Sequence, residues 1–242
     1  MSEKFSASDF GNSTKRRLPI CFCLDTSGSM QGDPIKQLNM GLQNFMSSIK
    51  ANDDTRSATD IAIITFGSSV DIVLPFGRIS KDKRLPDIQA STSLTPIGEG
   101  VLTALELLNA RKLGYRELGI KYFQPWIVVI TDGAPMGPNA MANYKAAVAA
   151  CNELERNDKL VVFNIGVGNA VDYDLLKQLS VKRPEPISVA SAEFGKLFEF
   201  LGSSSSSVVS SGMNDDALYN ISTEPEGESV DVDDFFRFLE EE

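Results

Sequence analysis

Side chains that carry oxygen gather at three separate points of this chain. Asp25, Ser27 and Ser29 alternate directly after one apolar run. Asp132 follows a second apolar run, and Thr95 precedes an expected helix. An alternating segment in extended backbone directs its three side chains the same way. Because carboxylate and hydroxyl oxygens suit a hard cation, this set predicts a site for Mg²⁺ or Mn²⁺.

The expected ligand set leaves the metal able to bind a further anion. Two carboxylates, Asp25 and Asp132, balance the charge of a divalent ion, while the hydroxyls stay neutral. Mg²⁺ gives up its water reluctantly, so a site with few charged protein ligands keeps open positions. The incoming anion we expect is an Asp or Glu carboxylate of a partner protein.

The order of apolar runs predicts the fold that positions these residues. Strands are expected at 18–24, 60–66, 69–74, 126–131, 160–167 and 186–189. Helices are expected to begin at Pro34 and Pro96 and to span 139–156, 173–179 and 192–201. Thr95 is the expected N-cap of the helix at Pro96. Helices between apolar strands indicate an α/β fold, a doubly wound and mostly parallel sheet with helices on both faces.

Two details of this sheet bear on the site. The strand at 69–74 follows the Gly67-Ser68 turn and is therefore expected to be an antiparallel edge strand. In a doubly wound sheet, ligands bind beyond the carboxyl ends of the strands. Asp25 and Asp132 both stand at such ends.

Composition divides the chain into three predicted parts. Residues 1–16 are expected to be a flexible arm, 17–202 the α/β domain, and 203–242 a Ser-rich linker with an acidic, mostly disordered tail. Residues 213–242 hold eleven acidic residues and one basic residue, and the remainder balances 22 against 22. A neutral body does not select nucleic acid or an anionic membrane, and the tail repels both.

The chain contains no histidine, which excludes Ser-His-Asp and Cys-His catalysis and zinc bound by histidine. Cys21 and Cys23 fall on the same side of one apolar strand and, with Cys151, are expected to be buried thiols in a reducing compartment. No apolar run near the start is long enough for a secretory signal or a membrane span. We therefore expect a cytoplasmic location.

The residues of the predicted site carry a family resemblance. Asp25-x-Ser27-x-Ser29, Thr95 and Asp132-Gly133 resemble the metal-ion-dependent adhesion site (MIDAS) of von Willebrand factor type A (VWA) domains. The resemblance covers about residues 18–201 and includes the order of strands and helices. It implies a Rossmann-like interaction module, not an enzyme. It also implies that the two serines bind the metal directly, that Thr95 binds directly or through water, and that the aspartates act mainly through bound waters.

A narrower resemblance suggests a biological setting. The runs at 17–35 and 94–98 are similar to stand-alone bacterial VWA proteins of the tellurium-resistance type. That likeness implies a role in tellurium resistance or in stress and defence signalling, with a protein kinase and a PP2C-like phosphatase as partners. Leu94 stands where such families often carry a small residue. Together with Met30 and Met136, it is predicted to form an apolar rim for the partner.

Two other functions are open at this point. A strand followed by Asp and a Mg²⁺ site also suits a phosphatase or phosphotransferase that forms a phosphoaspartate. Such enzymes usually carry a second Asp two residues after the first, and this chain has Ser27 there. A structural scaffold with a vacant site is the other alternative, and it predicts no metal dependence of any property.

Two further segments have both a functional and a structural interpretation. Residues 111–124 mix basic and aromatic side chains, as a packed helix end does or as a dock for an acidic or phosphorylated partner. Residues 229–239 interleave acids with Phe235, Phe236, Phe238 and Leu239. They are either a charged tail, a docking element that folds on binding, or a source of carboxylate for the metal of the same or another copy.

Overall fold

Six strands form one sheet in the computed structural model, which describes residues 15–91, 94–168, 171–190 and 194–211. The strands are β1 (Leu18–Asp25), β2 (Thr59–Phe66), β3 (Val70–Arg78), β4 (Trp126–Thr131), β5 (Val161–Val167) and β6 (Ile187–Val189). Their order is β3-β2-β1-β4-β5-β6, and every pairing is parallel except β2 with β3. This arrangement confirms the predicted α/β fold with one antiparallel edge strand.

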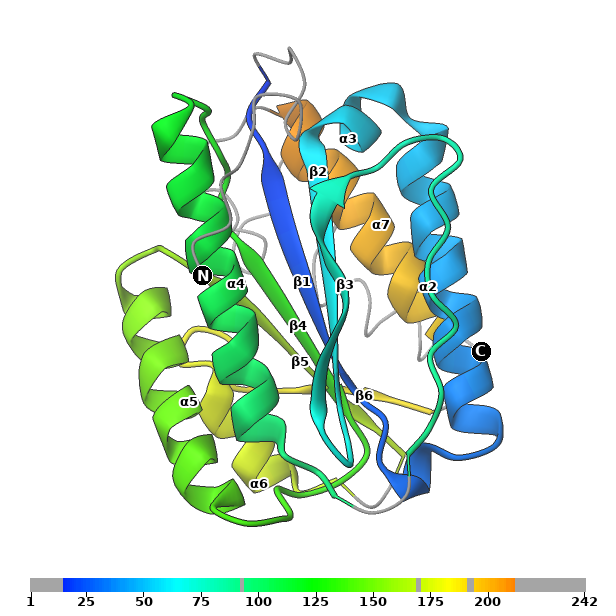
Figure 1. Cartoon of the computed structure of the whole chain (residues 1–242), viewed down its shortest axis with the longest axis vertical. Helices are drawn as coiled ribbons and strands as arrows, with labels where there is room; N and C mark the ends of the chain where they lie inside the picture. Colours follow the sequence, from blue (N-terminus) through cyan, green and yellow to red (C-terminus); the bar gives the residue numbers. More distant parts are fainter. Residues whose placement is uncertain (1–14, 92–93, 169–170, 191–193, 212–242) are drawn as a thin grey trace.

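Helices cover both faces of the sheet (Figure 1). They are α2 (Asp33–Ala51), α3 (Asp53–Ala58), α4 (Ile97–Glu117), α5 (Ala140–Arg156), α6 (Tyr173–Leu176) and α7 (Phe194–Ser211), with short 3-10 turns η1 (Gly28–Met30) and η2 (Lys177–Leu179). One apolar core lies between the sheet and α2 and α7, the other between the sheet and α4, α5 and α6. None of the described helices combines the length and the hydropathy that crossing a membrane requires.

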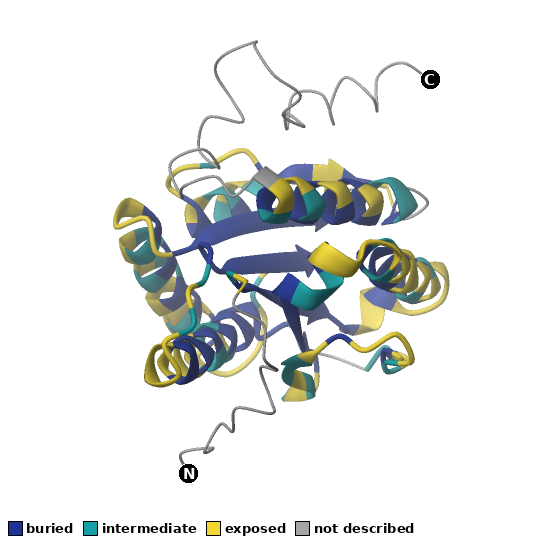
Figure 2. Cartoon of the chain, turned by 90° about the horizontal axis from the view of Figure 1, so that it is seen from above, coloured by how far each residue is buried: buried dark blue, intermediate teal, exposed yellow. Residues whose placement is uncertain are grey.

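Alternation along β1 divides its side chains between the two cores. Phe22 packs under α2 and α7, where its ring meets Phe45 and Phe198. Cys21 and Cys23 point to the other core, where they are fully buried free thiols together with Cys151. Their burial confirms the prediction of buried thiols, and it raises the pKa of all three. Viewed from above, buried residues form the inner strands of the sheet and the inward faces of the helices, whereas the edge strand β3 has no buried residue (Figure 2).

The last helix extends beyond its predicted end. We predicted that the helix ends at Leu201 and that a linker begins at 203, but α7 continues to Ser211. Gly202 lies within the helix and does not end it. The glycine lets α7 approach α2 closely, because a Cβ there would lie 2.8 Å from Ser48 Oγ. Buried contacts of Ser205 and Val208 stabilise the helix beyond that point, against the low helix propensity of serine. Residues 1–14 of the predicted arm, the acidic tail and segment 229–239 lie outside the described residues.

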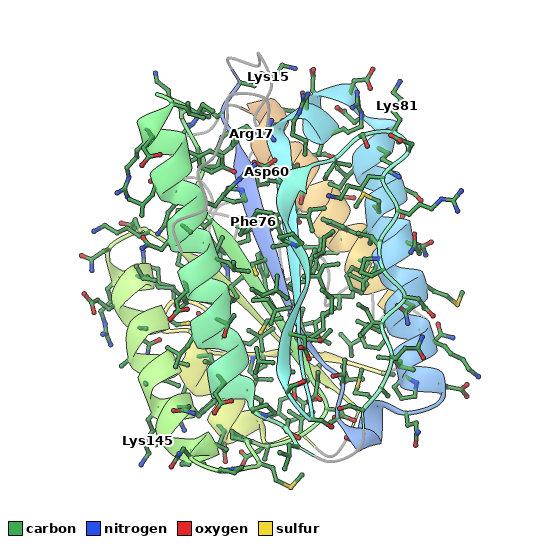
Figure 3. The ribbon with its side chains drawn as sticks, viewed as in Figure 1. Lys15, Arg17, Asp60, Phe76, Lys81 and Lys145 are labelled. Carbon is green, nitrogen blue, oxygen red and sulfur yellow. The ribbon has the colours of Figure 1, made fainter. Side chains whose placement is uncertain are left out.

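A buried ionic cluster joins the amino ends of β1 and β2. Arg17 and Arg111 both form salt bridges with Asp60, and all three side chains are at most 1% exposed. The hydroxyl of Tyr115 also donates to Asp60 Oδ2, at 2.5 Å. Figure 3 shows Arg17 beside Asp60 at this end of the sheet. The cluster therefore lies at the opposite end of β1 from Asp25.

Candidate metal site

The predicted site lies where the chain changes direction across the sheet. From β1 the chain moves to β2 on one side, and β4 returns to pair with the other side of β1. Asp25 is the last residue of β1, and Asp132 directly follows β4. Because Leu24 pairs with Ile130, the two strands end at the same level. The carboxyl ends of β1 and β4 thus form the crevice in which doubly wound folds bind ligands.

Hydrogen bonds join the serine loop to the aspartate loop. Ser29 Oγ donates to Asp132 Oδ1 at 2.8 Å, across 103 residues of sequence. Ser27 Oγ lies 3.1 Å from Ser29 Oγ. The structure therefore brings Ser27, Ser29 and Asp132 together as the sequence predicted.

Asp25 lies just beneath this group and is held on both oxygens. The backbone amide of Ser27 donates to its Oδ1 at 2.8 Å, and Thr131 Oγ1 donates to its Oδ2 at 2.5 Å. Thr131 also accepts a bond from the amide of Gly133 at 3.2 Å. The sequence analysis missed Thr131 as a positioning residue. The sequence feature that could have identified Thr131 is a hydroxyl at the last position of β4, directly before Asp132.

Thr95 reaches the site by a route that we did not predict. It is not the N-cap of α4, which begins at Ile97 after Pro96 and has no side-chain cap bond. Instead its backbone exchanges two hydrogen bonds of 3.0 Å with Met136, in the loop after β4. An ideal Cβ on Gly133 would lie 3.9 Å from Thr95 Oγ1, so the threonine side chain lies next to the Asp132-Gly133 turn.

The electrostatics of the site fit a cation. Asp25 is completely buried and Asp132 is 8% exposed, yet neither forms an ion pair with a basic side chain of the described residues. Burial raises the pKa of Asp25 to about 6, although bonds from Thr131 and Ser27 oppose the shift. Burial also raises the pKa of Asp132. Two buried carboxylates beside three hydroxyls supply oxygen ligands and a charge that a divalent ion would neutralise.

This donor set differs from a cluster of acids. Within the described ranges no three His, Cys, Asp or Glu side chains come together as a metal-binding group. The hydroxyls of Ser27, Ser29 and Thr95 must therefore complete any coordination at this edge, which makes the serine pattern as important as the carboxylates.

The raised pKa of Asp25 predicts how the metal-free protein responds to pH. A folded pKa of about 6 against an ordinary 3.8 gives stability that is present below pH 3.8 and lost as the pH rises through 6. The loss is about 3 kcal/mol. In EDTA, Asp25→Asn should therefore gain unfolding free energy relative to the unmodified chain between these pH values. Urea denaturation across the range measures the difference, and a difference independent of pH would contradict the assignment.

Of the three residues predicted to form an apolar rim, Met136 and Leu94 lie beside the site at least partly exposed, whereas Met30 is buried and cannot contact a partner. Met136 is 52% exposed, and half-buried Leu94 packs beside Gly137, whose ideal Cβ would lie 3.8 Å from both of its methyl groups. Met30 is fully buried in the core beneath α2, because the η1 turn directs it inward. Met141, 42% exposed in the first turn of α5, extends the uncharged surface that follows Gly133.

Gly98 holds the Thr95 loop in place through a close approach of two helices. A Cβ there would lie 2.2 Å from the backbone nitrogen of Tyr144 in α5. Gly98→Ala should lower the unfolding free energy by about 1–3 kcal/mol, since this clash outweighs the helix propensity of alanine. Gly195 in α7 has nothing within 4 Å of its Cβ position. Gly195→Ala is the control and should be neutral or stabilising; equal denaturation midpoints for the two variants would contradict this account.

The fold and the site together define a class of protein: a Rossmann-like domain with oxygen ligands gathered at its topological switch point. Comparison with known families agrees. The sequence model of the von Willebrand factor type A domain matches residues 20–202. The chain belongs to this family.

The relatives found are much longer proteins than this chain. Human inter-alpha-trypsin inhibitor heavy chain H2 is 28% identical over 169 residues, which cover 66% of this chain and 16% of that protein. A von Willebrand factor A domain-containing protein of Dictyostelium discoideum is 26% identical over 160 residues, with the same two shares. This chain therefore spans about one sixth of the length of these relatives.

Solved structures share the fold at low sequence identity. Proximal thread matrix protein 1 of the mussel byssus aligns with a TM-score of 0.55 and 18% identity, over 78% of this chain and 46% of that one. Manganese-loaded TRAP protein of Plasmodium vivax aligns with a TM-score of 0.52 and 21% identity, over 76% and 73%. The mussel protein is also known with a zinc-occupied MIDAS motif.

Proposed function

We propose that this chain is a protein-interaction module that binds its partner through a divalent cation. Asp25, Ser27, Ser29, Thr95 and Asp132 would hold the ion, and an Asp or Glu of the partner would supply a further oxygen. The observation that carries the proposal is the contact of Ser29 with both Ser27 and Asp132, beside two buried carboxylates without a basic partner among the described residues.

Within this site each residue has a distinct task. Ser29 is exposed and Ser27 is buried beside it, whereas Asp25 is held below them by Thr131 and by the amide of Ser27. A bound cation would supply electrophilic attraction for the partner's carboxylate. The neutral hydroxyls leave that attraction strong, because only Asp25 and Asp132 offset the charge of the ion.

The nature of the ion is also a proposal. Mg²⁺ or Mn²⁺ suits a ligand set made only of oxygen. Support for a divalent ion comes from two proteins of similar fold, one manganese-loaded and one with zinc in its MIDAS motif. Isothermal titration of the metal-free chain with each ion distinguishes them.

The site favours binding over catalysis. Ser27 occupies the position where a phosphoaspartate enzyme would need its second acid, and its hydroxyl is engaged with Ser29. A phosphatase assay of the purified chain with Mg²⁺ tests the alternative, and turnover that Asp25→Asn abolishes would replace our proposal. A scaffold with a vacant site predicts instead that neither ion binds.

The partner's surface can be described by chemistry. Leu94 and Met136 place apolar groups beside the site, so a suitable partner carries an acidic residue next to apolar ones. A protein kinase and a PP2C-like phosphatase of a tellurium-resistance or stress-signalling system, in the cytoplasm, are partners that we propose from the sequence resemblance alone.

One experiment tests metal-dependent binding directly. The tagged chain is used to capture proteins from its native cells with Mg²⁺ or with EDTA, and Ser27→Ala is compared with Ser47→Ala, which removes an exposed hydroxyl of α2. We expect a captured protein that EDTA and Ser27→Ala both remove and that Ser47→Ala retains. Capture that is insensitive to EDTA would contradict the proposal.

A further inference from the structure

Residues 1–212 have no net charge, but basic side chains gather at one end of the molecule. Four basic side chains lie where α4 ends and where the connections to β4 and β5 pass: Lys112, Arg116, Lys121 and Lys159. None of the four takes part in a salt bridge within the described ranges. This end lies at the amino ends of the parallel strands, opposite the metal site (Figure 1).

Lys112 is the most informative member of this group. The residue is only 9% exposed, and no hydrogen bond or ion pair of its ammonium group is found with the described residues. Burial lowers its pKa, and the positive charges of Arg116 and Lys159 lower it further. Three like charges therefore lie close enough to repel one another, and an anion placed between them would relieve that repulsion.

Exposed apolar side chains interrupt the basic ones. Leu113 is 47% exposed and Leu118 39% exposed, both at the end of α4. Arg116 donates to the hydroxyl of Tyr122 at 3.4 Å, and the ring of Tyr122 packs 5.4 Å from that of Tyr115. We call the surface formed by Lys112, Leu113, Arg116, Leu118, Lys121 and Lys159 the basic end. It alternates positive and apolar groups.

The chain itself carries a segment of matching chemistry. Residues 229–239 alternate acids with Phe235, Phe236, Phe238 and Leu239, within a stretch of eleven acidic residues and one basic residue. The described part of the chain ends at this same end of the molecule, because the last turns of α7 pack on α3, where Ser206 Oγ lies 3.2 Å from Thr55 Oγ1. A linker of roughly 20 residues reaches about 25 Å by coil statistics and gives an effective concentration near the millimolar range.

We propose that residues 229–239 dock on the basic end of their own chain. The acids would lie against Lys112, Arg116, Lys121 and Lys159, and the phenylalanines against Leu113 and Leu118. Charge complementarity, apolar complementarity and the position at which α7 ends all favour this occupant. The metal site, at the other end of the sheet, would stay open to a partner while the tail is docked.

Paramagnetic relaxation tests the docking in the full chain. A nitroxide label is attached to the cysteine of Ser229→Cys. The three native cysteines should not react with the label, because they are fully buried. We expect amide signals around Arg116, Lys121 and Lys159 to broaden at about 50 mM NaCl and to recover at about 500 mM, where the Debye length is about 4 Å. Signals around Ser27 and Ser29 should be unaffected.

A matched pair of variants shows whether charge at this surface is responsible. Arg116→Gln/Lys159→Gln removes two exposed charges of the basic end, and Lys36→Gln/Lys145→Gln removes two exposed charges elsewhere. Figure 3 places Lys145 at the end of the molecule away from Arg17. The first pair should lower the equilibrium constant for docking about tenfold, ~1.4 kcal/mol, and the second should leave it unchanged.

Each other outcome overturns the proposal in a recognisable way. Broadening around Ser27 and Ser29 would show that the tail occupies the metal site instead. Broadening that disappears when labelled chain is diluted with unlabelled chain would show docking between copies. No broadening beyond the residues next to α7 would show a tail that does not dock. None of these results bears on metal binding by the chain, which titration measures separately.

Discussion

Ser29→Ala is expected to lower the affinity of the chain for Mg²⁺ or Mn²⁺ by roughly 100-fold or more. The Ser29 hydroxyl links Ser27 to Asp132, so its loss would remove a proposed ligand and would release the carboxylate that it orients. Loss of a residue that merely supports a ligand typically costs 10- to 100-fold in metal affinity, and a direct ligand should cost no less. Isothermal titration of the metal-free variant measures the change.

Thr26→Val is the control for this prediction. Thr26 lies in the same loop, but its hydroxyl donates to the carbonyl of Phe66 at 3.1 Å and not to the site. The variant should lose about 1 kcal/mol of unfolding free energy and keep its metal affinity within about twofold. If both variants bind metal like the unmodified chain, the ion does not lie between these loops.

Asp60→Asn is expected to lower the unfolding free energy by about 3–5 kcal/mol. The substitution keeps the shape of the side chain but removes the carboxylate that Arg17 and Arg111 share in a fully buried position. Two guanidinium groups would then lie in the core without that counter-charge, and desolvation makes such a state costly. Urea denaturation at neutral pH provides the measurement.

Asp53→Asn is the matched control, because Asp53 also pairs with two basic residues, Arg56 and Lys81, but is 69% exposed. Solvent and salt screen such pairs, so the loss should be far smaller than that from Asp60→Asn. Similar losses from Asp60→Asn and Asp53→Asn would mean that the buried cluster does not stabilise the fold.

The fold was predictable because its signals are local and strong. Apolar runs such as 126–131 lie in the middle of the sheet and are buried on both faces. Because such strands alternate with amphipathic helices, only a few sheet topologies fit the sequence. The turn at Gly67-Ser68 correctly predicted an antiparallel strand at the edge. The helix α3 and the extension of α7 were missed, since a serine run has weak propensity and becomes helical here through burial of Ser205 and Val208 against neighbouring elements.

The amino-acid sequence by itself determined which residues form the candidate site, because strand ends in a doubly wound sheet meet at one edge and the alternation of Asp25, Ser27 and Ser29 sets their common direction. Only the tertiary structure decided how they are held. The contact of Thr131 with Asp25 depends on the register of β1 against β4, and the place of Thr95 depends on its backbone pairing with Met136. The burial of Met30 likewise depends on how the turn after β1 packs against the core. Contacts between segments distant in sequence have no local pattern, since they arise only when separate elements pack together.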